Sequence, residues 1–413
     1  MARRVVLAMV LLAVVLFPLP VLASDTRPGQ LACQGSGCRA QPVSAQRWAV
    51  RLAGTWSAGT GSGSTGDGGT VPAIGQAYVA VGGGVAVLGA GLSVTGYNLS
   101  SGKELWQTTL GAPVGTVIVS VRAWPGVVTV GLLAPDGRSR TEAVVEAMTG
   151  VELRRYPAAV FGGAVTASKA STVIIGPAAV TSYNNATGRV RWQHSTAGDQ
   201  SWQVDGQTLY VAESPGGYLS SSPVTALKVI DMATGTERTL TSPLGRPFSG
   251  TLAIAAGGAV LFASPAGVTA YSGSTGGELW VMRGAVPEGT DPEAALVDLT
   301  SPDGTLDGVD PLTGAVRAVV PAPAGAAGWY VVRGGVALGL GSGADGAAWG
   351  YSMSKGLVAW SSTALPWPHF FSDLSGLGGS AAVSGQTVVV TACPRLSASP
   401  GMCDDPELID LSP

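Results

Sequence analysis

Residues suited to acid–base or metal chemistry are few and scattered along this chain. Histidine occurs only twice, as His194 and His369, which argues against a histidine-based catalytic triad and against a metal site with several histidine ligands. Three aspartates, Asp303, Asp307 and Asp310, lie close together, and oxygen-rich loops bind calcium. Their spacing does not match an EF-hand loop, and Asp-Gly and Asp-Pro are ordinary turn sequences. We therefore expect turns here in preference to a calcium site.

The four cysteines fall into two pairs that are close in sequence, Cys33 with Cys38 and Cys393 with Cys403. Four cysteines allow three pairings, and we expect the two local ones in an oxidising compartment. A zinc site is the alternative, but the spacing does not suit it and no histidine lies near either pair. The prediction is two short-range disulfides that hold local loops.

An aromatic cluster and a short acidic run are the main candidates for contact with a partner. Trp367, His369 and Phe370 lie in one stretch, and aromatic side chains are common at binding hot spots. Asp404 and Asp405 follow the last cysteine as an acidic rim. The structural alternative is that Phe370 begins an inner strand and that the acidic run is a solvated loop. Paired carboxylates for glycoside hydrolysis need a set separation, which a sequence does not give.

Charge and glycine patterning argue against nucleic acids and nucleotides as ligands. The net charge is −3 and no basic patch is present, so binding to nucleic acid is not expected. Gly61–Gly66 matches G-x-G-x-x-G, but a dinucleotide site needs a preceding strand and a following helix. The surrounding Gly/Ser-rich run is typical of a flexible loop.

The elements that would position any site are repeated hairpins. The clearest copy, Tyr97–Trp106 (YNLSSGKELW), predicts a strand, a tight turn with glycine at its tip, and a second strand that carries tryptophan. The 61 glycines and 27 prolines disfavour long helices. Further copies, complete or degenerate, have their turn glycine at Gly150, Gly188, Gly235, Gly276, Gly314 and Gly356.

Self-similarity at about 40–45 residues predicts a β-propeller built of four-stranded antiparallel blades. Gln46–Leu52 matches the second half of the hairpin, and Glu407–Pro413 matches the first half. We expect these two end segments to pair and to close the propeller, which removes exposed sheet edges. This arrangement gives eight blades, with seven as the alternative.

The tryptophan four residues after the turn glycine is predicted to be structural. On a sheet face it would pack against the next blade and bury ~150–250 Å² of surface. In three blades, Arg154, Thr239 and Ala318 replace it. The expected blade tryptophans are Trp48, Trp106, Trp192, Trp280 and Trp360.

The N-terminal segment Met1–Ala23 has the features of a secretory signal peptide. Arg3 and Arg4 precede an apolar run, Val5–Phe17, and small residues precede Ser24. A retained membrane anchor is the alternative, although the run is short for a span. We expect a secreted or cell-envelope protein with a leader over residues 24–44 and a propeller over residues 45–413.

The order strand, Thr/Ser-Gly-x-x-x-Trp, strand resembles the pyrroloquinoline-quinone (PQQ) enzyme repeat over most of residues 45–413. The resemblance implies an eight-bladed propeller and two kinds of function. One branch comprises quinoprotein dehydrogenases, which hold PQQ and calcium above the central channel. The other comprises non-catalytic scaffolds, such as the propeller lipoprotein of the outer-membrane β-barrel assembly machine.

This chain departs from the enzyme branch. It has no adjacent cysteines, whereas many of those enzymes place a vicinal disulfide against the quinone, and none of their metal-binding or catalytic positions can be matched. We therefore predict no catalytic residue, no metal and no cofactor. The expected function is a non-catalytic scaffold for another envelope or extracellular protein. A PQQ/calcium-dependent enzyme and a carbohydrate-binding or carbohydrate-cleaving propeller are the alternatives.

Blade geometry predicts the face on which a partner would bind. Loops between the second and third strands, and loops between blades, emerge on one face of a propeller, and variable loops on a rigid scaffold commonly carry sites. The long segments expected on that face are Gly54–Thr70, Ser214–Pro223, Gly284–Glu293, Ser362–Ser372 and Cys393–Cys403.

Overall fold

The fold is all-β in the computed structural model. No helix in the part of the chain that the model describes is long and apolar enough to cross a membrane. The described residues are 48–52, 56–57, 63–64, 70–71, 78–159, 162–176, 178–196, 200–213, 224–242, 245–291, 294–320, 326–333, 336–341, 348–352, 357–362, 381–384, 387–392, 402–403 and 407–410.

Seven antiparallel sheets are each built from four consecutive strands. The first four are β5 (Tyr78–Gly82), β6 (Val85–Ala90), β7 (Ser93–Asn98) and β8 (Glu104–Thr109); β9 (Val117–Trp124), β10 (Val127–Leu133), β11 (Arg140–Glu146) and β12 (Glu152–Ala158); β13 (Gly163–Ala167), β14 (Ser171–Ile175), β15 (Ala179–Asn184) and β16 (Val190–Ser195); and β17 (Gln200–Asp205), β18 (Thr208–Glu213), β19 (Ala226–Asp231) and β20 (Glu237–Leu240).

The other three consecutive sheets follow the same order. They are β21 (Thr251–Ala256), β22 (Ala259–Ser264), β23 (Gly267–Ser272) and β24 (Glu278–Arg283); β25 (Val286–Asp291), β26 (Leu296–Thr300), β27 (Leu306–Val309) and β28 (Val316–Val320); and β29 (Ala326–Arg333), β30 (Val336–Gly341), β31 (Ala348–Ser352) and β32 (Leu357–Ser362). Valine-rich alternation between glycine turns accounts for these short strands.

One further four-stranded sheet joins the two ends of the chain. It orders β33 (Ala381–Ser384), β34 (Thr387–Ala392), β36 (Glu407–Asp410) and β1 (Trp48–Arg51). Trp48 lies opposite Asp410, so the predicted pairing of the two ends is confirmed. Two small pairs complete the described strands: β2 (Trp56–Ser57) with β35 (Met402–Cys403), and β3 (Gly63–Ser64) with β4 (Thr70–Val71).

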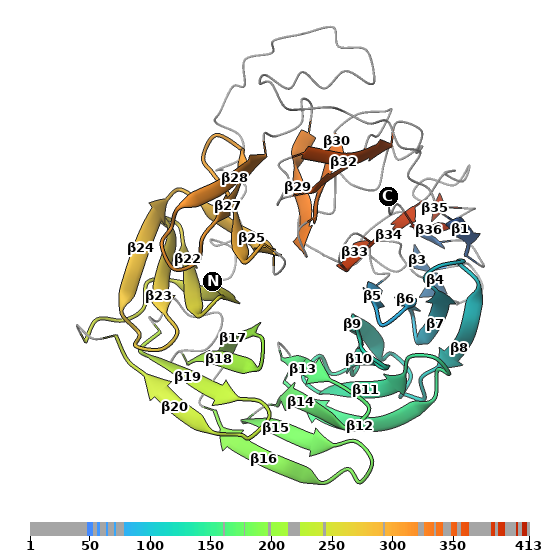
Figure 1. The fold of residues 1–413 in the computed structure, drawn as a ribbon. Coiled ribbons are helices and arrows are strands. Elements are labelled where there is room, and N and C mark those ends of the chain that lie inside the picture. Colours follow the sequence, from blue (N-terminus) through green and yellow to red (C-terminus); the bar gives the residue numbers. More distant parts are fainter. Residues whose placement is uncertain are drawn as a thin grey trace, which may run out of the picture.

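The four-stranded sheets follow one another around a common centre, with the first strand of each nearest to it (Figure 1). Strand β33 of the split sheet contacts both β29 and β5, so that sheet lies between the first and last consecutive sheets. Apolar side chains fill the spaces between neighbouring sheets. In one such cluster, Val87 and Trp106 pack with Val130 and Val145 of the next sheet.

Backbone hydrogen bonds identify which turns share a face of the ring. Leu110 N, at the end of β8, bonds to Leu92 O in the β6–β7 turn, and Gly284 N bonds to Ala266 O in the β22–β23 turn. The second-to-third-strand turns and the links between sheets therefore lie on one face. On the opposite face Ala147 N, in the β11–β12 turn, bonds to Gly126 O in the β9–β10 turn.

The expectation of a long inter-blade loop at Gly284–Glu293 is wrong. Residues 286–291 form strand β25, so the link to the preceding sheet is a short turn at Gly284 and Ala285. Pro287 of this strand lies beside a register shift between Pro287 and Gly289. Proline is tolerated in strands at such bulges because a ladder hydrogen bond is already missing there.

Candidate functional site

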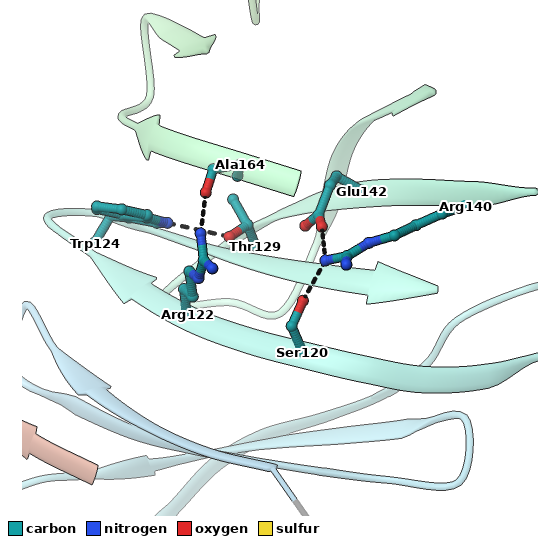
Figure 2. A network of polar contacts seen from close by, with 7 residues as sticks. All are labelled: Ser120, Arg122, Trp124, Thr129, Arg140, Glu142 and Ala164. Atoms are coloured by element: carbon teal, nitrogen blue, oxygen red, sulfur yellow. Dashed lines mark hydrogen bonds and ion pairs between the residues drawn. The ribbon is translucent and has the colours of Figure 1, made fainter. Parts of the chain in front are cut away.

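A polar network lies between the second and third consecutive sheets (Figure 2). Its core is an ion pair on β11, in which Arg140 Nη2 lies 2.5 Å from Glu142 Oε1. The two side chains are only 8% and 2% exposed. Arg140 Nη2 also donates to Ser120 Oγ of β9 at 2.7 Å. Both charges of the pair are therefore almost completely shielded from solvent.

Local sequence explains how the pair fits into the sheet interface. Arg140 and Glu142 are two residues apart on a strand, so both side chains lie on the same face of the sheet. Gly131 of β10 and Gly163 of β13 leave the space that the pair occupies. A Cβ atom added at Gly163 would lie 2.6 Å from Glu142 Oε1 and 2.7 Å from Arg140 Nη2. The interior glycine of β10 therefore has a packing role.

Burial shapes the protonation of this site. Loss of solvent raises the pKa of Glu142, and the Arg140 and Arg122 guanidinium groups oppose that rise. Burial likewise raises the pKa of Tyr78 on β5, and Arg140 again acts in the opposite direction.

Arg122 of β9 crosses from its own sheet to the next two. Its Nη1 donates to the backbone oxygen of Ala164 on β13 (Figure 2). Its guanidinium carbon lies 5.0 Å from the ring centroid of Trp202 on β17, a cation–π geometry. Nearby, Trp124 Nε1 donates to Thr129 Oγ1 at 3.1 Å. These contacts hold three innermost strands together.

This arrangement of side chains is suited to binding a ligand and to holding neighbouring sheets together. Glu142 is held by a charge-assisted bond to Arg140 and is buried, which does not suit a general base that must reach a substrate. Within the described ranges no group of three or more His, Cys, Asp or Glu residues is placed to hold a metal ion. Arg122 and Trp202 are both partly exposed, and they present a cation stacked on an aromatic ring.

A second recurring arrangement joins neighbouring sheets through a tryptophan that is present on every other sheet. Trp106 is 7% exposed, and its Nε1 donates to Ala147 O of the next sheet at 2.7 Å. Its ring covers the turn glycine of that sheet, because a Cβ at Gly150 would lie 2.6 Å from the indole. Gly150 also has a φ of 72°, which favours glycine. The repeated tryptophan and turn glycine are therefore one packing unit.

The same unit occurs twice more. Trp192 Nε1 donates to Met232 O at 3.2 Å and Trp280 Nε1 donates to Pro311 O at 2.9 Å. Each acceptor precedes the turn glycine of the next sheet by three residues, as Ala147 precedes Gly150. The structure places these three tryptophans between sheets. Trp48 and Trp360 lie in β1 and β32, but their side chains are outside the described part.

Arginine makes the corresponding contact in two of the three sheets where tryptophan is missing. Arg154 Nη2 donates to Ala186 O in the next turn at 2.7 Å. Arg238, beside Thr239, donates to Ser274 O and Gly273 O at 2.8 and 2.9 Å. This role of arginine was not predicted from the sequence, although Arg154 occupies the tryptophan position of its repeat.

Comparison with known families agrees with this repeat architecture. A family model described as "Outer membrane protein assembly factor BamB" matches residues 176–333. These residues are PQQ-like propeller repeats. No curated protein matches the sequence.

Several solved structures are similar to this chain at low sequence identity. The computationally designed Ika8 protein has a TM-score of 0.52 and 14% identity, over 81% of this chain and 96% of Ika8. BamB from Moraxella catarrhalis has a TM-score of 0.40 and 18% identity, over 67% of this chain and 80% of BamB. Quinohemoprotein alcohol dehydrogenase ADHIIG from Pseudomonas putida HK5 has a TM-score of 0.48 and 14% identity, over 88% of this chain and 75% of the enzyme.

His194 lies within the PQQ-like repeats and connects two of the sheets. Its Nδ1 lies 2.8 Å from Glu237 Oε2, and its Nε2 lies 2.5 Å from Gly235 O. The ring is about one-fifth exposed. His194 therefore joins β16 to β20 and to the turn that precedes β20.

Two of the three aspartates that suggested calcium, Asp303 and Asp310, serve as turn residues, and Asp307 lies in strand β27. Asp303 Oδ1 accepts from Thr305 N, and Asp310 Oδ1 accepts from Leu312 N and Thr313 N. Asp307 accepts from Ser301 Oγ. These carboxylates satisfy local donors, as Asp side chains commonly do in turns.

The remaining predicted site residues lie outside what the structure describes. They are Cys33, Cys38 and Cys393 of the expected disulfides, and the candidate interaction residues Trp367, His369, Phe370, Asp404 and Asp405. Cys403 lies on β35 opposite Trp56 of β2, but the structure describes only its backbone.

Asp298 of β26 is a buried acid that the sequence did not single out. It has no exposed surface, and neither of its carboxylate oxygens has a hydrogen-bond partner among the described residues. Burial, together with the Asp291 carboxylate, raises the pKa of Asp298 from 3.8 to about 7. Gly289 and Gly308 flank it on the neighbouring strands.

We expect Asp298→Asn to gain stability relative to the parent chain as pH rises from about 4 to about 7. The folded pKa lies above the unfolded value, so the parent is most stable with a protonated Asp298. That stability falls by about 1.4 kcal/mol per pH unit across this window. Asparagine does not titrate, so the difference should grow with pH and then level off. Urea unfolding of both proteins at several pH values measures it.

Asp303→Asn is the matched control for this titration. Hydrogen bonds from Thr305 lower the pKa of the exposed Asp303 carboxyl below 3.8, so its contribution to stability changes only at lower pH. The difference between the parent and Asp303→Asn should therefore stay constant from about pH 4 to about pH 7. A difference between parent and Asp298→Asn that stays constant from about pH 4 to about pH 7 would contradict the assignment.

Proposed function

We propose that this chain is an extracytoplasmic, non-catalytic scaffold that binds another protein through one face of its propeller. The observation that carries the proposal is the use of polar groups near the centre of the ring. Arg140, Glu142, Ser120 and Arg122 bond to one another or to backbone of neighbouring sheets. Side chains that support the ring in this way are not free to act on a substrate.

The family match supports an envelope location and a protein partner. The matching model describes an outer-membrane assembly factor, and the N-terminal Met1–Ala23 segment has the composition of an export signal. The binding face that we propose carries the second-to-third-strand turns and the links between sheets. The sequence and length of such turns can vary without destabilising the strands that they connect.

Photo-cross-linking from both faces tests the proposed binding face. Benzoylphenylalanine replaces an exposed residue in one of three turns of the proposed face, at Arg138, Pro265 or Pro302. Matched positions on the opposite face are Met148, Ser274 and Leu312. In cells that express the chain, we expect adducts of defined mass from the first set at several-fold higher yield. Equal yields from both sets would contradict the proposed face.

A thermal-shift measurement separates the scaffold from a PQQ-dependent enzyme. A ligand at 100 times its dissociation constant adds about 2.7 kcal/mol to stability. We expect no change in melting temperature when PQQ and calcium are added together to the full chain. A shift of about a degree or more that requires both components would instead favour the quinoprotein alternative.

A further inference from the structure

We propose that the outer edge of β24 is a second docking site, which accepts an extended segment of a partner protein as an added strand. The site is on the side wall of the ring, so it does not depend on the loop face proposed above. The partner segment would place apolar side chains over Leu279 and Val281 and a carboxylate next to Arg283.

The composition of β24 sets it apart from comparable strands. The fourth strand of each consecutive sheet is an edge strand, and natural edge strands are commonly protected by charged residues or proline. Strand β12 contains Arg154, Arg155 and Pro157, and β16 contains Arg191 within its run. Among the six outer strands with described side chains, β24 alone has four uncharged apolar residues in succession, 279–282.

The two faces of β24 are used differently. Trp280 and Met282 pack into the cluster between this sheet and the next. Leu279 and Val281 alternate with them and remain 39% and 53% exposed. Apolar side chains at positions i and i+2 of a strand form a continuous surface on one face. That surface has no cover among the described residues.

Unpaired backbone groups lie along the same strand. In the described part of the chain β24 pairs with β23 and with no other strand. Its far edge therefore presents free N–H and C=O groups, which an extended peptide can bond as an additional strand. Main-chain bonds of this kind supply affinity, and side-chain pockets supply specificity.

A groove on this face supplies such a pocket. It encloses about 430 Å³ and is lined by Gly267 and Thr269 of β23 and by Val281 and Arg283 of β24, among others. Gly267 lies opposite Arg283 and contributes no side chain. Arg283 is exposed and is the one charged residue in the lining. A carboxylate on the incoming segment would complement it.

Two copies of β24 do not supply this carboxylate to each other. In an antiparallel pair, residues directly opposite each other lie on the same face of the sheet. When a twofold axis relates two copies of one strand, the residues that lie opposite each other must therefore be separated by an even number of positions, because side chains alternate between the faces. Glu278 and Arg283 are five apart and lie on opposite faces. No twofold register brings them together, which favours a different protein over a second copy.

The test is binding of a fluorescent probe peptide to the full chain, followed by anisotropy. The probe is an extended peptide of alternating valine and threonine with one glutamate. We expect saturable binding that Val281→Lys and Leu279→Lys each weaken at least about tenfold. N-methylation of alternate peptide amides should abolish it, and replacing the glutamate by lysine should weaken it, because backbone pairing and the Arg283 contact would be lost.

Gln193→Lys is the matched control, because Gln193 has the position in β16 that Val281 has in β24, five residues after the turn glycine. Gln193 also borders a corresponding groove. We expect the Gln193→Lys variant to bind the probe as the parent does. Unfolding midpoints of all variants identify any loss of fold. Absence of binding to the parent, or equal binding by Val281→Lys, would overturn the proposal. So would concentration-dependent dimerisation that Val281→Lys abolishes, because a second copy would then be the occupant.

Discussion

Replacing Trp106 by alanine is expected to lower the free energy of unfolding by about 3–5 kcal/mol. The indole is 7% exposed and fills the space over Gly96 and Gly150 on two neighbouring sheets. Alanine leaves that space empty, and glycine offers no side chain that could move into it. The Ala147 carbonyl also loses the donor that lies 2.7 Å away. Denaturant unfolding gives the change through the shift in midpoint at constant slope.

Three related variants separate the contributions to this loss. Trp106→Phe keeps most of the apolar surface and removes the N–H donor, so it should cost roughly 1–2 kcal/mol. Trp192→Ala should cost less than Trp106→Ala because Trp192 is more exposed. Gln107→Ala, at an exposed neighbour, is the surface control. If Trp106→Ala and Gln107→Ala had the same midpoint, the packing unit would have no energetic importance.

Replacing Glu142 by alanine is expected to cost about 3–5 kcal/mol, because it removes one member of a buried ion pair and with it a charge that compensates the other. Arg140 would remain enclosed near Arg122 and would keep its hydrogen bond to Ser120. Glu142→Gln should cost less because the amide oxygen still accepts a hydrogen bond. Denaturant unfolding near neutral pH provides both values.

A double-mutant cycle distinguishes loss of the pair from loss of volume. Arg140→Met combined with Glu142→Leu removes both charges and keeps apolar bulk, and such replacements of buried pairs are often close to neutral. We expect the double variant to be more stable than Glu142→Ala, with a coupling energy of about 1–3 kcal/mol between the two sites. Strictly additive effects of Arg140→Met and Glu142→Leu would show that the two side chains do not act as a pair.

The repeat pattern was sufficient to predict the class of fold. Tyr97–Trp106 and its copies specify a strand, a glycine turn and a second strand by local chemistry alone, because turn glycines and alternating residues act over a few positions. The split pattern at Gln46–Leu52 and Glu407–Pro413 was sufficient to predict that the chain ends pair. The loop expected at Gly284–Glu293 was wrong, because pairing with β26 makes residues 286–291 the strand β25.

The contacts between sheets were decided by the tertiary structure. The sequence identified Trp106 and Gly150 as repeated residues, but not that one covers the other, because they are 44 positions apart. The same applies to Arg122, which reaches Ala164 and Trp202 only after three sheets are assembled.

The burial of charge was likewise decided by assembly. Nothing around Glu142 or Asp298 in the sequence distinguishes it from an exposed acid on a strand. Desolvation of a side chain depends on the groups that pack against it, and here those groups come from segments that are distant in the sequence. The exposed edge of β24 depends on both the sequence and the tertiary structure. The apolar run 279–282 is visible in the sequence, whereas the free edge follows from the outer position of β24 in its sheet.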